Sequence, residues 1–149
     1  MKRRDLAIGL STLAATAACT ADPATTERNR PQDTLQGTWR AVDAQRDGAS
    51  ARDLLGHELT FTGDRFRITS EGTLVFGGTW SADATLAPPR IEFVQTEGAE
   101  LRGTWKGIYR LDGGRLEIVD NAAEVSRPAP TTFATSPGSG HVLVRFERR

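Results

Sequence analysis

Short runs in which apolar and polar residues alternate are the feature that most constrains how this 149-residue chain can fold. Leu59 and Phe61 alternate with polar residues, and Phe66 and Ile68 repeat the pattern after the stretch 62–65. A period of two is typical of strands with one buried face, and a short break rich in turn formers predicts a hairpin. The same pattern recurs farther along the chain, at Ile91 and Phe93, at Trp105, Gly107, Tyr109 and Leu111, at Leu116 and Ile118, and at Val142, Val144 and Phe146.

These runs, together with the segments around Trp39 and Trp80, predict eight antiparallel strands in residues 35–149. Eight strands in simple order favour an all-β, eight-stranded antiparallel up-and-down barrel, because closing the sheet leaves no strand edge unpaired. An open sandwich of two sheets is the alternative. The length suffices for one domain with a modest core.

Two segments depart from this strand pattern. One short helix is expected near residues 50–56, where Ser50 and Asp53 have the spacing of a capping box ahead of two leucines. Residues 120–140, rich in Pro, Ser, Thr, Ala and Gly, are expected to form one long irregular stretch before the last strand.

A basic start and an uncharged run precede the one cysteine of the chain, Cys19. Lys2, Arg3 and Arg4 lead into a run from Leu6 to Ala18, which is shorter than the roughly 20 residues that a membrane-spanning helix needs. A basic region, a short apolar region and small residues before a cleavage site are the parts of an export signal. The layout predicts a lipoprotein signal peptide over residues 1–18, with the thiol of Cys19 as the lipidated group.

Lipidation of Cys19 predicts a membrane anchor in the cell envelope, with the polar residues 19–34 as a flexible tether. Thr20 follows the cysteine where an Asp would mark inner-membrane retention, so an outer-membrane position facing the periplasm is favoured. An ordinary secretory leader with a coincidental cysteine is the alternative. Arg3-Arg4 leaves export through the Sec or the twin-arginine route open.

The charge balance argues against a nucleic-acid-binding protein. The whole chain has 19 basic and 19 acidic residues, and removing residues 1–18, which contain three basic residues and one acidic residue, leaves 16 against 18, a net charge of −2. Nucleic-acid binding needs a clustered basic surface, and the arginines here are scattered along the chain.

The tripeptide Gly-Thr-Trp occurs three times, ending at Trp39, Trp80 and Trp105. It is interpreted as a strand-entry motif, in which glycine permits a close approach and the tryptophan fills the barrel end. Gln36-Gly37-Thr38-Trp39 resembles the Gly-x-Trp signature of lipocalins. That resemblance implies that Trp39 plugs the closed end of the barrel and that Arg145 or Arg148 stacks over it.

A wider resemblance covers nearly all of residues 35–149. The segments that carry it are 35–39, Leu59-Thr60-Phe61 with Gly63-Asp64, 89–91, 107–113, Arg127-Pro128, Phe133 and 137–140. In these segments the chain is similar to a lipocalin-like domain of unknown function that is abundant in planctomycete lipoproteins. This resemblance implies the barrel fold and the envelope location, and it implies no activity.

No constellation of residues points to an enzyme, and no cofactor is expected. His57 and His141 are the only histidines, too few for a metal site without several carboxylates, and both are expected to be exposed residues at strand ends. Ser136 and Ser139 lie near His141, but the strand-turn-helix context of a nucleophile elbow is missing, so a flexible turn is favoured.

The aromatic residues are the best candidates for binding. Tyr109, Trp80, Trp105 and Phe93 are predicted to line the barrel interior and to contact a small apolar or amphipathic ligand, with core packing as the alternative role. The first functional hypothesis is therefore a non-catalytic, ligand-binding envelope lipoprotein. The second is a protein-interaction or inhibitor module with a filled barrel, which contacts another envelope protein through its loops.

Overall fold

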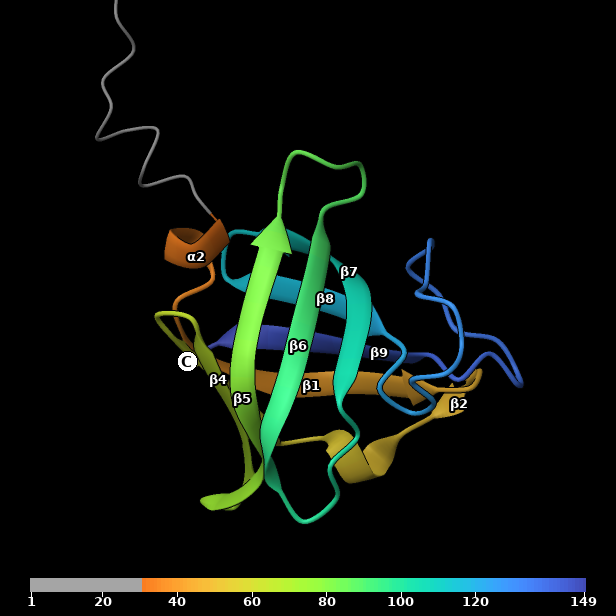
Figure 1. Cartoon of the computed structure of the whole chain (residues 1–149), viewed down its shortest axis with the longest axis horizontal. Helices are drawn as coiled ribbons and strands as arrows, with labels where there is room; N and C mark the ends of the chain where they lie inside the picture. Colours follow the sequence, from red (N-terminus) through yellow and green to blue (C-terminus); the bar gives the residue numbers. More distant parts are fainter. Residues whose placement is uncertain (1–30) are drawn as a thin grey trace, which may run out of the picture.

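The computed structural model describes residues 31–149, and Figure 1 shows the strands of this part following one another along the chain. One turn of α-helix, α2 (Pro31–Thr34), comes first, and one turn of 3-10 helix, η1 (Arg52–Leu54), lies between the second and third strands. The strands are β1 (Gly37–Arg46), β2 (Ala49–Ser50), β3 (Glu58–Thr62), β4 (Arg65–Ser70), β5 (Thr73–Asp83), β6 (Arg90–Gly98), β7 (Thr104–Asp112), β8 (Arg115–Asp120) and β9 (Val142–Arg148).

The strands form an antiparallel sheet that closes on itself. The order is β2-β1-β3-β4-β5-β6-β7-β8-β9, and β1 also pairs with β9, from Trp39 opposite Arg148 to Arg46 opposite Val142. The two-residue strand β2 only extends the end of β1. The remaining eight strands make a closed up-and-down barrel, which confirms the predicted fold class and excludes the open sandwich.

The short helix near residues 50–56 is present as the single turn η1, but its predicted cap does not form. Ser50 belongs to β2, and the residue that precedes the turn is Ala51, without a side-chain cap. The backbone of this segment is bound to β1 instead, because Ala51 donates to Ala44 at 2.9 Å and Gly56 donates to Ala41 at 2.9 Å. Tertiary contacts with β1, and not a local capping box, therefore hold this turn.

Aromatic side chains that point inward from neighbouring strands fill much of the barrel. Phe66 packs edge-on against Phe93 with ring centroids 4.9 Å apart, and Phe93 stacks on Trp105 at 5.7 Å. Phe61 lies 4.4 Å from Trp80. Their inward position follows from the period of two, which places alternate residues of each strand on the same face of the sheet.

One end of the barrel is plugged. Trp39 and Leu35 have no exposed surface, and the indole Nε1–H of Trp39 donates to the carbonyl of Leu35 at 2.9 Å. Figure 1 shows α2 and the C-terminus together on this side of the molecule, whereas η1 and the turn between β6 and β7 lie at the opposite end. Trp39 thus marks the closed end of the barrel, and a cavity opens at the other end.

The three Gly-Thr-Trp tripeptides occupy different places. Gly37 begins β1 in a conformation that favours glycine (φ 110°). Gly78 lies within β5, where a Cβ atom would come within 1.9 Å of the Val94 carbonyl oxygen. Trp39 is at the closed end, and the Nε1–H of Trp80 donates at 3.0 Å to Gly63 in the β3–β4 turn, but Trp105 lines the cavity of the open end. The interpretation as one barrel-end motif therefore fails for Trp105.

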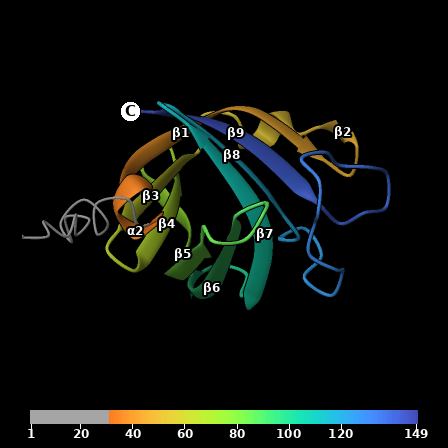
Figure 2. The same cartoon turned by 90° about the horizontal axis from the view of Figure 1, so that it is seen from above.

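Residues 121–141 contain no helix or strand and pack beside the barrel, next to β8 and β9, as Figure 2 shows. Phe133 from this segment contacts a small cluster on the outer face of the sheet, formed by Ile108, Val119 and Leu143. The Arg110 guanidinium lies 4.3 Å from the centre of the Phe133 ring. An outer hydrophobic cluster thus fixes the irregular segment to the barrel wall.

Candidate ligand cavity

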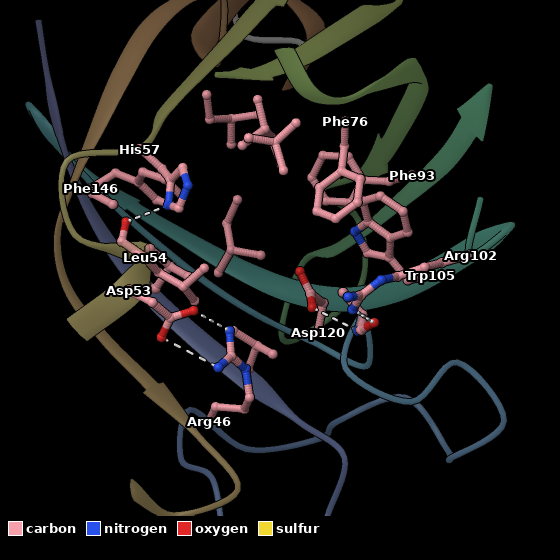
Figure 3. A pocket seen from close by; sticks show the side chains of 18 residues that line it. Arg46, Asp53, Leu54, His57, Phe76, Phe93, Arg102, Trp105, Asp120 and Phe146 are labelled. Atoms are coloured by element: carbon pink, nitrogen blue, oxygen red, sulfur yellow. Dashed lines mark hydrogen bonds and ion pairs between the residues drawn. The ribbon is translucent and has the colours of Figure 1, made fainter. Parts of the chain in front are cut away.

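A cavity of about 280 Å³ opens into the barrel at the end opposite Trp39. Figure 3 shows side chains pointing into it from several strands and from the segments at the mouth. The apolar and aromatic part of its lining is formed by Ala41, Leu54, Leu59, Ile68, Val75, Phe76, Phe93, Trp105, Ile118, Ala122, Val142, Val144 and Phe146, and the ionisable part by Arg46, Asp53, His57, Arg102 and Asp120.

The apolar wall follows directly from the strand pattern. Leu59, Ile68 and Phe93 belong to three different strands, and each is an inward member of an alternating run. Small inward side chains such as Ala41 and Val144 are among those that line the cavity. The cavity is therefore the part of the barrel interior that the side chains do not fill.

One side of the mouth carries a paired charge. The Arg46 guanidinium binds the Asp53 carboxylate with distances of 3.0 and 3.4 Å, and this hydrogen bonding lowers the pKa of Asp53. His57, expected to be an exposed strand-end residue, is half-buried and lines the cavity, and its Nδ1 lies 2.9 Å from the Leu54 carbonyl oxygen. Because Arg46 and Asp53 neutralise each other, they add little net charge to the cavity.

The other side of the mouth carries Asp120 and Arg102. Asp120 ends β8, and its Oδ1 accepts a hydrogen bond from the Ala122 N–H at 2.9 Å. Arg102 lies in the β6–β7 turn and donates to the Ala122 carbonyl at 2.7 Å. Burial raises the pKa of Asp120 to about 7, although the Ala122 N–H and the charge of Arg102 act to lower it. An acidic group that is half-protonated near neutral pH therefore faces an apolar cavity.

Sequence reasoning did not single out Asp120 or Arg102. For Asp120 such a signal exists in the sequence. Leu116, Ile118 and Asp120 occupy every second position of β8, so the period of two that points Leu116 and Ile118 inward also points Asp120 inward. A charged residue in phase with an inward apolar run is the pattern to look for. For Arg102, which lies in a turn, the local sequence carries no comparable signal.

The structure brings two of the four predicted ligand-binding residues to the cavity. Phe93 and Trp105 line it, but Trp80 and Tyr109 do not. Trp80 is buried near the β3–β4 turn at the closed end. Tyr109 is part of the packed core, where burial, with a smaller effect of Asp83, raises the pKa of its phenol. These two residues contribute to the packing of the barrel instead of the cavity wall.

The two arginines considered for stacking over Trp39 have different places. The Arg148 guanidinium lies 4.1 Å from the centre of the Trp39 ring. Arg145 is bound on the outside of the barrel, to Glu117 at 2.7 Å and to Asp43. Hydrogen bonding to Glu117 is the main reason that the pKa of Arg145 is raised. Arg148 therefore holds the position above the plug, and Arg145 belongs to a charge network on the outer face.

The remaining candidate residues do not converge on a reactive site. The Nε2 of His141 lies 2.8 Å from the Pro128 carbonyl oxygen, and the Ser139 hydroxyl accepts from the His141 backbone N–H at 3.2 Å, as in a turn. Residues 31–149 contain no group of three or more His, Cys, Asp and Glu side chains placed to hold a metal ion. Cys19 lies outside the described residues, and among those described no helix is long and apolar enough to span a membrane.

Comparisons with protein-family models, with curated proteins and with solved structures find no match to this chain.

Proposed function

We propose that this protein is a non-catalytic carrier or receptor that binds a small apolar or amphipathic molecule in its barrel cavity. The observation that supports the proposal most directly is the cavity itself. It is open at one end, plugged by Trp39 at the other and lined mainly by apolar side chains, with a few polar groups at its mouth. This is the usual composition of a small-molecule site.

The physical basis of binding would be the release of water from an apolar wall. At about 30 Å³ per molecule in the liquid, the cavity has the volume of roughly nine waters. Replacing them with an apolar group contributes about 25 cal/mol for each Å² of apolar surface removed from water. The volume of about 280 Å³ lies just below the range of about 300–1,000 Å³ for ligand sites, so the proposal applies to a compact ligand.

A cavity-filling variant tests this function. Val144 lines the cavity, whereas Val94 on β6 is 38% exposed on the outer face. Native mass spectrometry of the chain from Thr20 to Arg149 should detect a bound small molecule, either co-purified or from an added lipid and metabolite panel. We expect Val144→Phe to abolish this mass shift and the matched control Val94→Phe to retain it.

If the unmodified protein shows only the apo mass against the whole panel, the carrier proposal fails. The hypothesis of a protein-interaction module then becomes the better one. If both variants bind as well as the parent protein, a ligand exists but does not occupy the cavity.

We further propose that lipidation of Cys19 anchors the barrel in the cell envelope. The basic start, the short apolar run and the cysteine after small residues support this proposal. The mature protein from the native host should then carry a lipid mass on a peptide that begins at Cys19. Cys19→Ser should remove that mass and release the protein from the membrane fraction, and a parent protein with an unmodified thiol would refute the proposal.

A further inference from the structure

The charged groups on the two sides of the cavity mouth differ in how closely they are paired. Arg46 and Asp53 form a neutral pair on one side. On the other side, Arg102 is bound to the Ala122 carbonyl and, at 3.5 Å, to Glu100, whose side chain is 78% exposed. A guanidinium has five N–H donors, so these two contacts leave others for a ligand. Of the two guanidinium groups on the cavity wall, Arg102 is thus the one with the longer carboxylate contact.

The carboxyl of Asp120 strengthens this preference when it is protonated. Its Oδ1 is engaged by the Ala122 N–H, so Oδ2 is the oxygen left to carry a proton. Burial raises the pKa of this group to about 7, so its protonated and ionised forms coexist around neutral pH. Other charged groups around the mouth are the Arg46–Asp53 pair and His57, while Lys106 on β7 is directed to Glu92.

These contacts define the polar end of the ligand. We propose that the cavity binds an amphipathic monocarboxylate, whose apolar chain lies among Phe93, Trp105 and their neighbours and whose carboxylate lies between Arg102 and Asp120. The proposal rests on the carrier function above and names the ligand class. A guanidinium and an O–H donor both form charge-assisted hydrogen bonds with a carboxylate, and these bonds are stronger than those between neutral groups.

Binding would then be coupled to proton uptake. The ligand carboxylate is ionised between pH 6 and 8, whereas Asp120 loses its proton across this range, so the binding-competent fraction decreases as pH rises. With a pKa of about 7, this fraction and the affinity should decrease about tenfold between pH 6 and pH 8. At pH 7, binding should take up about half a proton per ligand from the buffer.

Three probes of equal chain length test the ligand class by isothermal titration calorimetry. They are octanoate, octan-1-ol and octylamine, which present an anion, a neutral hydroxyl and a cation on the same apolar chain. We expect the purified protein to bind octanoate at least tenfold more tightly than the other two probes at pH 6. Repeating the titration in buffers of different ionisation enthalpy measures the proton uptake.

Four variants assign the effect to residues. Arg102→Gln should reduce the preference for octanoate over octan-1-ol at least fivefold, and Arg102→Lys should keep part of it. This ratio is insensitive to a general loosening of the cavity. Arg67→Gln removes one exposed positive charge from the outer face of β4 and should leave the ratio unchanged. Asp120→Asn keeps an acceptor for the Ala122 N–H, so we expect octanoate binding that no longer depends on pH.

The possible outcomes separate this inference from the carrier function. If none of the three probes binds and the native mass spectra show only the apo protein, both fail. If octan-1-ol binds as tightly as octanoate, or octylamine binds more tightly, the cavity is a ligand site and only the monocarboxylate inference is overturned. If the pH dependence persists in Asp120→Asn and disappears in His57→Asn, Asp120 is not the proton donor and the inference is overturned as well.

Discussion

Arg148 on the last strand, β9, contacts both the Trp39 plug and the segment that leads into β1. Its guanidinium covers the Trp39 ring and donates to the Gln36 carbonyl at 2.7 Å and the Thr34 carbonyl at 2.9 Å. Arginine suits this position because its planar group can stack on an aromatic face while its edge donates hydrogen bonds. Lysine would have to give up one of these two interactions.

Removing this side chain should destabilise the barrel. We expect Arg148→Ala to lower the free energy of unfolding by about 1–3 kcal/mol, from the loss of the stacking and of two charged hydrogen bonds. Urea denaturation followed by tryptophan fluorescence measures the change. Arg67→Ala, which removes an exposed arginine from β4, is the matched control and should change the midpoint little. Equal midpoints for the two variants would show that the Arg148 contacts contribute nothing to stability.

Asp120 should give the stability a characteristic pH dependence. Its pKa is raised from 3.8 to about 7 on folding, so between these values the folded protein binds the proton that the unfolded chain has lost. This group therefore lowers the free energy of unfolding as pH rises through this window. We expect Asp120→Asn to match the parent protein at pH 4 and to exceed it at pH 8 by at most about 4 kcal/mol.

Denaturation of both proteins at several pH values isolates this effect, because every other group is common to the two. Carboxylates with lowered pKa values, such as Asp53, act in the opposite direction but equally in both proteins. A stability difference that does not vary with pH would contradict a titrating, buried Asp120.

At the scale of elements, the β6–β7 turn is held by one buried amide. The Gln95 Nε2 donates to the Glu97 and Glu100 carbonyls at 3.1 and 2.6 Å, and its Oε1 accepts from the Arg102 N–H at 2.9 Å. Gln95 is only 6% exposed, so these bonds are protected from water. The turn that presents Arg102 to the cavity is therefore fixed from inside the sheet.

Gln95→Leu should release this turn while the barrel stays folded. The substitution leaves three backbone groups without their partner, and we expect a loss of about 1–3 kcal/mol. Amide hydrogen exchange should become faster in residues 97–103, and exchange in β8 and β9 should stay slow. Unchanged exchange in the turn would mean that Gln95 does not hold it.

Strands were the elements that the sequence predicted best. The alternating runs at Leu59, Ile91 and Val142 correspond to β3, β6 and β9, because burial of one face imposes a period of two on the sequence itself. The Ser50 capping box failed because β1 supplies backbone partners from outside the segment. A short local pattern carries no information about such partners.

The cavity could be predicted only in part. Inward residues were recognisable, which is why Phe93 and Trp105 were found, but the same pattern also selected Trp80 and Tyr109. Which inward residues face an empty space depends on their height along the barrel axis, and that height is set by register and strand tilt, not by the period. Arg102 reaches the cavity through a turn, where no periodicity applies.

At the scale of the whole molecule, closure makes every strand depend on the others. The pairing of β1 with β9 joins residues about a hundred positions apart, from Trp39 with Arg148 to Arg46 with Val142. No barrel strand is left as a separable edge within the described part of the chain. We infer that the closed end and the cavity walls unfold as a single cooperative unit.

This cooperativity can be measured with one reporter at the plug. In the double variant with Trp80→Phe and Trp105→Phe, fluorescence reports on Trp39 alone, whereas far-UV circular dichroism follows the entire sheet. We expect the two urea denaturation curves of this variant to coincide. A separate, later transition at Trp39 would instead identify the closed end as an independently stable substructure.

The positions of Pro31 and Arg149 decide which end of the barrel faces a support to which the protein is linked. Pro31, where the described chain enters, and Arg149, where it ends, both lie at the closed end, and Arg148 joins these two regions through Gln36 and Thr34. A bead or a sensor chip linked directly at Pro31 or at Arg149 therefore meets the closed end of the barrel first. The mouth with Arg102 and Asp120 then faces away from the support, which leaves it accessible to the ligand that we propose.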